Sequence, residues 1–524
     1  MRSSTRYLSA LAVLALGLLS LIWPASAQPR IPSRSVERVI VHGRDATSTR
    51  NEATSFELLG GNRPESKVTP APAGAARLIP QPVGSGFDAL EDPVSVPSDT
   101  TGARGDSFIV AAVNTQVAVY DLNGNQVVAP IQLEDLFPAP DNTAFDPKVV
   151  YDQYDDTFVV VYLVQKDSPR LSKIVAVAIP NATASNTSTW CANSFKGDAV
   201  PGGKQLWADY PGLGFNDTRI TITTNQFTFP SSRGRFSSSQ VLTIDKFGLY
   251  DCAQPDPVAT VFAGSATRDD KGNKAFTLRP AETVGSAPGS QLMLSFGNVQ
   301  GRGDYLTVWR ITPTSSGFAL KKASFRTGKV SLPPLGTQQG GGLNTPNGWW
   351  DAGDTRFVNA FYDADRNELF TAHPVLKNLK PDTLTGGYPE SAIRWYEVDP
   401  DRKLKNSAIV RKGTIGNAEV DVGWPSVATD SSGVLFVTYN RASEPRNEFL
   451  SAWVSTIQPS STADSELLLK SGLTTYNAIG GPERWGDFTA INRDPANGQN
   501  VATFNQFAQS KDQWRQFISL VTDN

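Results

Sequence analysis

Histidine and cysteine are almost missing from this chain, which has two of each among 524 residues. The histidines, His42 and His373, are too few for a His-rich zinc site, and they argue against a Ser-His-Asp triad. The cysteines, Cys191 and Cys252, predict one disulfide if the protein reaches an oxidising compartment. Two buried free thiols are the alternative.

Long apolar runs are also scarce. Only residues 8–23 are nearly all apolar. Arg2 and Arg6 precede this run and a small-x-small cleavage site ends at Ala27, which is the pattern of a secretory signal peptide over 1–27. No later segment reaches the length of an apolar membrane span, so we predict none in the mature chain, with a retained N-terminal anchor as the alternative. The expected location is secreted, periplasmic or at the cell surface.

The chain has no excess of positive charge. It contains 48 lysines and arginines against 51 acidic residues, a net charge of -3. Loss of the signal peptide would remove two of the arginines and no acid, which makes the mature chain more acidic. A nucleic-acid partner needs a basic surface, so this balance argues against one, and it argues equally against binding to anionic membranes.

Glycine, proline and aromatic residues are plentiful, with 43 Gly, 36 Pro and 10% aromatics. Short β-branched or aromatic runs lie between clusters of Gly, Pro, Asn and Asp, and long amphipathic helical periodicity is essentially absent. The predicted strands include 158–163, 174–179, 220–224, 240–244, 292–296, 305–311, 433–439 and 517–521.

Residues 28–84 differ from the rest because they are rich in Pro, Ser, Arg and Gly. This composition predicts a mostly flexible leader, with one strand near 36–41. The remaining residues, 85–524, form the predicted folded domain.

A divergent repeat runs through this domain. Each copy has a polar opening with Trp, Asp or Pro, a short strand, an Asp-rich turn, and a second strand that often ends in Asn. Five clear copies open near residues 145, 207, 350, 424 and 485, and two weaker copies lie near 108 and 276. Units of this size cannot bury both sheet faces alone, so they must pack against one another. We therefore predict an all-β protein with a single β-propeller of seven four-stranded blades. Six or eight blades, or tandem β-sandwiches, are the alternatives.

Several short motifs follow one another in a fixed order between about residues 100 and 520. They are 111–124 with 146–152, the Trp-x-Asp-Tyr-Pro element 207–211 with 224–227, Asp245-Lys246 with Leu249-Tyr250, and Arg-Trp-Gly-Asp at 484–487. In this order they resemble a widespread group of exported bacterial β-propeller proteins, largely of unknown function. The resemblance implies a fold and export, and it implies no activity.

The repeat also suggests where a site could lie. In a propeller the first strand of each blade starts at one face and the second strand returns to it, so the opening Asp and the closing Asn should share a rim. The candidate ligand-binding residues are Asp146, Asp209, Asp354, Asp487, Asn225, Asn440, Asn505, Trp207, Trp350 and Trp485. Convergent oxygens suit Ca²⁺ or hydrogen bonding to a sugar or peptide. Alternatively, these residues cap backbone N–H groups and pack between blades.

Our main functional expectation is an extracellular binding or scaffold module for an unknown ligand or protein. The alternative is a carbohydrate-active hydrolase, since glycosidases use two carboxylic acids and tryptophans can stack on sugar rings. The chain lacks the Ser-x-Asp-x-Gly-x-Thr-Trp repeat of sialidases, and the nearest stretch, 429–433, lacks the Thr-Trp ending. A purely structural surface protein is the third possibility, and no catalytic residue is assigned.

Overall fold

The structure is a computed structural model of the 524-residue chain. The residues it describes are 31–36, 39–42, 79–92, 95–140, 143–198, 205–297, 303–342, 348–377, 389–402 and 408–523. The predicted signal peptide, 1–27, lies outside the described residues, as does most of the predicted leader. Within the described residues no helix is long and apolar enough to cross a membrane.

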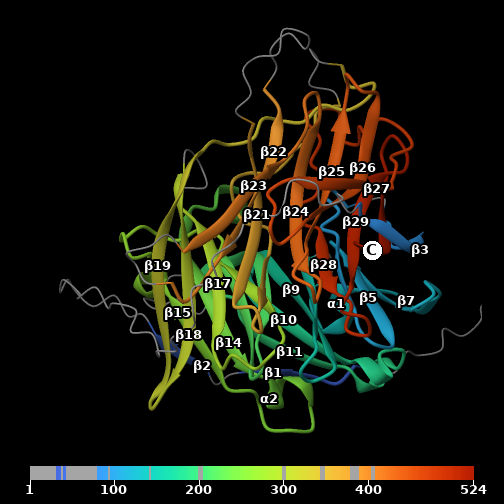
Figure 1. The fold of residues 1–524 in the computed structure, drawn as a ribbon. Coiled ribbons are helices and arrows are strands. Elements are labelled where there is room, and N and C mark those ends of the chain that lie inside the picture. Colours follow the sequence, from blue (N-terminus) through green and yellow to red (C-terminus); the bar gives the residue numbers. More distant parts are fainter. Residues whose placement is uncertain are drawn as a thin grey trace, which may run out of the picture.

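Nearly all of the regular structure is β-strand (Figure 1). The strands of the described residues pair into seven antiparallel, four-stranded units, in which neighbours along the chain are mostly neighbours in the sheet. Units 1 to 3 are β4 (Thr101–Arg104), β5 (Phe108–Val113), β6 (Gln116–Asp121), β7 (Gln126–Gln132); β8 (Ala144–Asp152), β9 (Thr157–Asp167), β10 (Arg170–Pro180), β11 (Cys191–Lys196); and β12 (Leu206–Phe215), β13 (Arg219–Thr228), β14 (Phe236–Asp245), β15 (Ala259–Ala263).

The remaining four units have the same form, and the last of them combines three C-terminal strands with one N-terminal strand. Units 4 to 7 are β16 (Arg279–Val284), β17 (Gln291–Phe296), β18 (Gly303–Thr314), β19 (Gly317–Val330); β20 (Ala360–Asp363), β21 (Glu368–Leu376), β22 (Ser391–Val398), β23 (Ile409–Ile415); β24 (Asp421–Thr429), β25 (Leu435–Ser443), β26 (Glu448–Ile457), β27 (Asp464–Lys470); and β28 (Ala490–Arg493), β29 (Asn500–Ala508), β30 (Trp514–Thr522), β3 (Gln81–Asp88).

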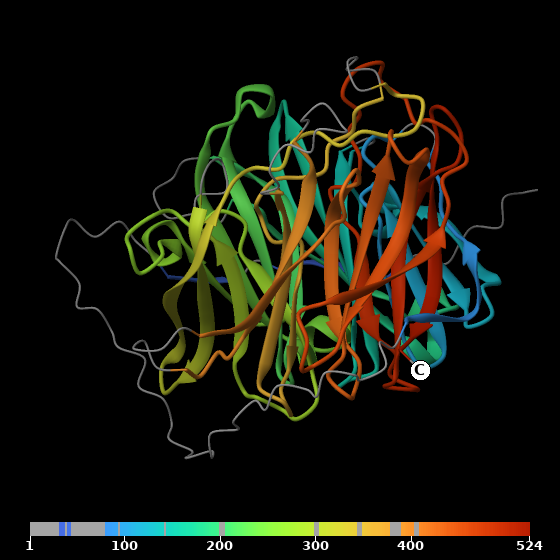
Figure 2. The ribbon, with the colours of Figure 1, turned by 45° about the horizontal axis from the view of Figure 1, so that its top comes forward.

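The first strands of the seven units form a closed circle. β4 contacts β8, and the contacts continue through β12, β16, β20, β24 and β28 back to β4. Between units 4 and 5 the first strands even pair in parallel, with Ala281 opposite Ala360. Figure 2 shows the sheets standing side by side around the molecule. This arrangement is a β-propeller, as predicted, with the first strand of each unit next to the central axis.

Strand β3 closes the ring. Gln81 pairs with Thr522 and Asp88 with Phe517 in an antiparallel ladder against β30. β3 spans the boundary that we placed between residues 84 and 85. Two further strands of the predicted leader pair in parallel with outer strands: β1 (Ser33–Ser35) with β11, and β2 (Val39–His42) with β15. β1 and β2 thus lie on the outside of units 2 and 3.

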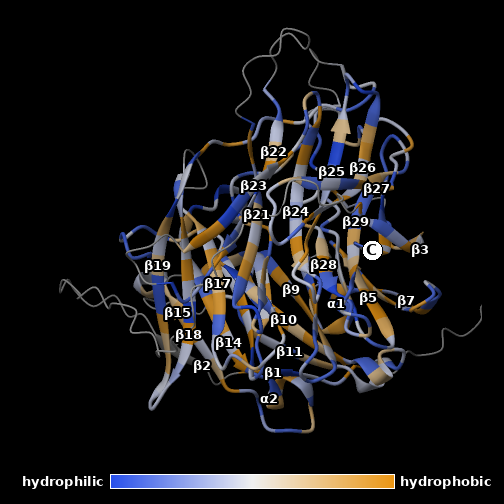
Figure 3. Ribbon diagram, in the orientation of Figure 1, coloured by the Kyte–Doolittle hydropathy of each residue, from blue (hydrophilic) through white to orange (hydrophobic). Residues whose placement is uncertain are grey.

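Apolar side chains fill the spaces between units. Val117 of unit 1 and Val160 of unit 2 belong to one buried cluster, and Phe370 of unit 5 and Val437 of unit 6 belong to another. In Figure 3 apolar residues recur along many of the strands, which also carry hydrophilic stretches, and many turns are hydrophilic. Each fully buried side chain of this size stabilises the fold by about 1.5 to 3 kcal/mol relative to exposure.

Among the residues that the structure describes, helical structure is limited to short segments within connections. They are α1 (Leu133–Leu136), α2 (Lys246–Tyr250) and the 3₁₀ turns Asn181–Thr183, Thr187–Thr189, Ser231–Arg233 and Gly264–Thr267. The predicted disulfide is confirmed: Cys191 at the start of β11 is bonded to Cys252, just after α2. It joins the outer parts of units 2 and 3.

The Asp-rich turns of the repeat cap the ends of the first strands. Asp152 Oδ1 accepts a hydrogen bond from the Tyr154 N–H at 3.1 Å, and Asp430 Oδ1 accepts one from the Ser432 N–H at 2.9 Å. The same local bond recurs at Asp363, Asp494 and Asn216. These side-chain oxygens accept hydrogen bonds from backbone N–H groups of the turn. This explains why the repeat has Asp or Asn at this position.

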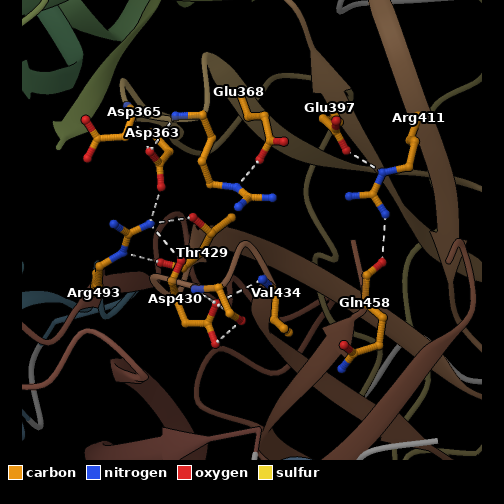
Figure 4. Close-up of polar contacts among 12 residues, drawn as sticks. Asp363, Asp365, Glu368, Glu397, Arg411, Thr429, Asp430, Val434, Gln458 and Arg493 are labelled. Carbon is orange, nitrogen blue, oxygen red and sulfur yellow. Dashed lines mark hydrogen bonds and ion pairs between the residues drawn. The ribbon is translucent and has the colours of Figure 1, made fainter. Parts of the chain in front are cut away.

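At the same end of the ring, Arg493 connects three units (Figure 4). Its Nη2 lies 2.5 Å from Asp363 Oδ2 of unit 5 and donates to Thr429 Oγ1 of unit 6 at 2.9 Å. Its Nε donates to the Thr429 carbonyl at 2.8 Å, and its Nη2 also reaches the Asp430 carbonyl at 2.8 Å. Asp363 is almost completely buried, so this arginine is the cation that compensates its charge.

Candidate functional site

The opposite end of the first strands has an unusual backbone. Non-glycine residues with positive φ stand at or just before the first strand in six of the seven units. They are Asp99, Asp146, Tyr210, Thr277, Trp424 and Asp487. In β8, β12 and β24 this residue is followed by proline and coincides with a β-bulge, which bends the strand and redirects its side chain. Such strained positions occur often at functional sites, where the rest of the fold must support them.

Four aspartates gather at this end of the channel, and we call Asp99, Asp146, Asp209 and Asp487 the mouth cluster. Backbone contacts hold their units together: Asp146 Oδ2 accepts a hydrogen bond from the Tyr210 N–H at 3.1 Å. The Tyr210 hydroxyl donates to the Asp487 carbonyl at 3.0 Å, and the Asp99 N–H donates to the Gly486 carbonyl at 3.0 Å. The cluster therefore joins units 1, 2, 3 and 7.

Burial raises the pKa of three carboxyls of the mouth cluster. Burial, reinforced by the Asp209 and Asp487 carboxylates, raises the pKa of Asp146 to about 7. Burial also raises the pKa of Asp209 to about 6, although Arg356 opposes the rise. The pKa of Asp99 is raised well above its ordinary value, first by burial and then by Asp146 and Asp487. Asp99 shares a side-chain hydrogen bond with Asp146, and no other described group bonds to its two oxygens. The cluster can thus both donate and accept protons.

Two arginines stand beside the mouth cluster. Arg356 Nη2 pairs with Asp354 Oδ2 at 2.7 Å, and its Nε donates to Asp354 Oδ1 at 2.8 Å. The Arg356 guanidinium also lies 4.3 Å from the Tyr210 ring centroid. Arg484 Nη2 pairs with Asp487 Oδ2 at 2.7 Å. The mouth therefore mixes carboxylates and guanidinium groups, which can together bind a ligand rich in hydroxyl groups.

A row of half-buried aromatic rings, which we call the aromatic ridge, leads up to Arg356. Trp207, Phe227, Phe236 and Phe276 follow one another with centroid distances of 5.4, 5.9 and 4.9 Å. The Arg356 guanidinium lies 5.2 Å from the Phe276 ring centroid. Because the rings are half-buried, part of each remains accessible. Aromatic surfaces of this kind stack on the apolar faces of ligands.

The structure brings some of the sequence-predicted residues together at the mouth and places others elsewhere. Asp146, Asp209 and Asp487 belong to the mouth cluster, Asp354 is paired with Arg356 beside it, and Trp207 begins the aromatic ridge. The Trp207 Nε1 donates to the Thr228 carbonyl at 3.2 Å.

The predicted asparagines are buried between units. Asn225 donates to Thr277 Oγ1 at 2.8 Å, which connects unit 3 to the segment that enters unit 4. Asn440 donates to Asn505 Oδ1 at 2.8 Å, which connects units 6 and 7. Trp350 and Trp485 are also buried in the core. These five residues pack and cross-link neighbouring units, which is the structural role considered above.

Sequence reasoning missed Asp99, Arg356, Phe236 and Phe276. Asp99 stands just before β4 as Asp487 stands just before β28, so alignment of residue 99 with the clear repeats would have found it. Arg356 follows Asp354 by two residues in the opening of unit 5, as Lys148 follows Asp146 in unit 2, so the shared spacing was the signal for it. Among the described residues, no three His, Cys, Asp or Glu side chains are grouped to hold a metal ion, and the calcium site stays a prediction.

The raised pKa of Asp146 predicts a pH-dependent stability. A carboxyl whose pKa is raised from 3.8 to about 7 binds its proton more tightly in the folded state. Its contribution to the free energy of unfolding therefore falls as pH rises through this range. Asp146→Asn has no proton to lose and keeps an acceptor for the Tyr210 N–H. Between pH 4.5 and pH 8, the wild type should therefore lose on the order of 2 kcal/mol of unfolding free energy relative to the variant.

Urea unfolding at several pH values measures this difference, with Asp106→Asn at an exposed position as the control. Parallel pH profiles for the wild type and Asp146→Asn would contradict the prediction.

No family model and no curated protein sequence matches this chain. Solved structures that resemble it include a protein of unknown function from Dyadobacter fermentans, with 11% identity, a TM-score of 0.39, and coverage of 72% of this chain and 94% of the other. The GH93 α-L-arabinofuranosidase of Fusarium graminearum has 8% identity, a TM-score of 0.37 and coverage of 84% and 98%. A Trypanosoma rangeli sialidase mutant has 9% identity, a TM-score of 0.36 and coverage of 78% and 57%. Similarities this low assign no function to the chain.

Proposed function

We propose that the protein is an exported binding module that holds a carbohydrate at the mouth of its propeller. The observation that carries this proposal is the aromatic ridge, which runs from Trp207 to Phe276 and ends beside Arg356. A sugar ring has an apolar face that packs on aromatic rings and hydroxyl groups at its edge that bond to carboxylates and arginines. Binding sites commonly combine apolar surface with a few placed polar groups in this way.

The charges at the mouth support a neutral, hydroxyl-rich ligand. Asp354 and Asp487 are each paired with an arginine, so their charges are largely compensated. The raised pKa values of Asp146 and Asp209 leave these two carboxyls partly protonated near neutral pH. Protonated and ionised carboxyls together offer both donors and acceptors to hydroxyl groups.

A glycoside hydrolase is the second candidate, and the pKa values at the mouth favour it. A glycosidase needs one protonated acid for the leaving oxygen and one ionised carboxylate across the sugar. Asp146, whose pKa is raised to about 7, has the property of the acid. Asp487, which pairs with Arg484 at 2.7 Å, is the candidate for the second carboxylate.

Glycan-array screening of the mature protein, followed by calorimetry on the glycans that bind, tests the proposal. Phe236→Ala removes one ring of the ridge, and Asp209→Asn changes one carboxyl of the mouth cluster. Each should weaken binding at least about tenfold, which corresponds to roughly 1.4 kcal/mol. Phe247→Ala is the matched control because this phenylalanine is 69% exposed on α2, outside the ridge. An array without bound glycans, or ridge variants that bind like the wild type, would refute the proposal.

Incubation of each bound glycan with the protein separates the two candidates. A binding module leaves the glycan intact, as chromatography of the mixture would show. A hydrolase releases new reducing ends, and Asp146→Asn should then slow their release at least about a hundredfold, since general acid catalysis contributes this much.

A further inference from the structure

A small cavity lies on the axis of the ring, further along the first strands than the mouth cluster. Its volume is about 20 Å³, a size that holds one or two water molecules. First strands from several units line it, and three of its lining residues have ionisable side chains: Lys148 from β8, and Arg279 and Glu282 from β16. Buried positive charges beside this cavity need a compensating negative group.

Arg279 is a buried cation whose guanidinium lies 4.3 Å from the Tyr210 ring centroid. Its side chain is 1% exposed, and its Nε and Nη1 donate to the carbonyls of Phe357 at 3.0 Å and Pro211 at 2.6 Å. Its Nη2 has no hydrogen-bond partner among the described residues. No described carboxylate oxygen lies within 4.0 Å of an Arg279 nitrogen, which is the limit for an ion pair. A guanidinium stays charged in proteins, and a buried charge without a counter-ion is strongly unfavourable.

Lys148 adds a second nitrogen to the cavity. Its Nζ lies 3.5 Å from the Phe488 ring centroid, and it forms no ion pair with a described carboxylate. Burial, and then the charge of Arg279, lower the pKa of Lys148 well below its ordinary value.

Glu282 does not supply the missing negative charge. Burial raises the pKa of Glu282 to about 8, against the opposing effect of Lys148, so this carboxyl is mostly neutral at pH 7. The mouth acids Asp99 and Asp146 also act on Lys148, and burial raises the pKa of both.

We propose that this cavity binds one small monovalent anion of the size of chloride, between Arg279 Nη2 and Lys148 Nζ. A space that holds one or two water molecules fits an ion of this size. Arg279 and Lys148 each lie over an aromatic ring, Tyr210 and Phe488, and the centroids of these two rings are 4.8 Å apart. The bound anion would connect β8 of unit 2 to β16 of unit 4, and it would be a structural ion separate from the carbohydrate site.

Crystals of the mature protein grown in sodium bromide test the site directly, because bromide replaces chloride and scatters anomalously. We expect one anomalous peak within hydrogen-bond distance of both Arg279 Nη2 and Lys148 Nζ. Crystals of Lys148→Met should lose the peak, because methionine keeps the length and the contact with Phe488 but has no N–H group to donate to the anion. A cavity that holds only water, or a peak that is unchanged in Lys148→Met, would overturn the proposal.

Thermal unfolding tests it in solution, with chloride exchanged for gluconate at constant ionic strength. An ion that binds only the folded state should raise the Tm of the wild type by about 1 to 2 °C for each tenfold increase in chloride above its Kd. Lys148→Met should lose this dependence. Lys271→Met is the matched control, since this exposed lysine also lies over an aromatic ring, 3.3 Å from the Tyr305 centroid. A wild-type Tm that is equal in chloride and gluconate overturns the proposal.

Discussion

Replacing Arg493 by methionine is expected to lower the free energy of unfolding by about 3 to 5 kcal/mol, the usual cost of leaving a buried charge without its partner. The side chain of Asp363 is only 3% exposed, and Arg493 is its ion-pair partner at 2.5 Å. The same guanidinium donates to Thr429 and to the Asp430 carbonyl, so units 5, 6 and 7 lose a common connection together (Figure 4).

Urea unfolding of the variant measures the loss. The double variant Arg493→Met, Asp363→Asn should regain part of the stability, because it leaves no uncompensated charge. Arg326→Met is the surface control: its partner is Asp304 at 3.6 Å and its side chain is 88% exposed, so a change below about 0.5 kcal/mol is expected. If Arg493→Met and Arg326→Met are equally stable, the proposed role of Arg493 is wrong.

Replacing both cysteines by alanine should cost about 4 kcal/mol, because the bridge between Cys191 and Cys252 closes a long loop in the unfolded chain. The two residues are 61 positions apart and belong to the outer parts of units 2 and 3. Unfolding of the variant by urea, compared with the wild type under oxidising conditions, gives the difference.

Reduction provides the control for this prediction. The wild type in the presence of a phosphine reductant strong enough to open the bridge should become about as stable as the double alanine variant, which itself should not respond to the reductant. A double variant as stable as the oxidised wild type would show that the bridge contributes little.

The sequence was sufficient to predict an all-β propeller, because the repeat is visible wherever the first strand opens with Trp, Asp or Pro. The sequence was insufficient for a unit whose first strand lacks this opening because its residues are determined by packing. The first strand of unit 1 is β4, Thr-Gly-Ala-Arg, and its Gly102 leaves room for the Phe504 ring of unit 7. We placed the strand of this copy at Phe108, which is the start of the second strand, β5. Asp99 was missed for that reason.

Unit 4 was a weak copy for a different reason. Its first strand, Arg-Pro-Ala-Glu-Thr-Val, contains Arg279 and Glu282, which line the axial cavity. Charged residues at these positions interrupt the apolar pattern by which the other strands were found. The mouth site was predicted in part, since three aspartates of the mouth cluster and Trp207 follow the repeat. Arg356, Phe236 and Phe276 depend on contacts between units, which the repeat alone does not contain.

Strand β3 has a consequence for how the protein folds. Six of the seven units consist of strands that follow one another closely, so each can form soon after its own residues are available. Unit 7 cannot, because it pairs Gln81 near one end of the chain with Thr522 near the other. Contacts so distant in sequence form late and slowly. The ring must therefore remain open until synthesis of the C-terminal strands is complete, and loss of a few residues at either end of the folded domain would reopen the same seam.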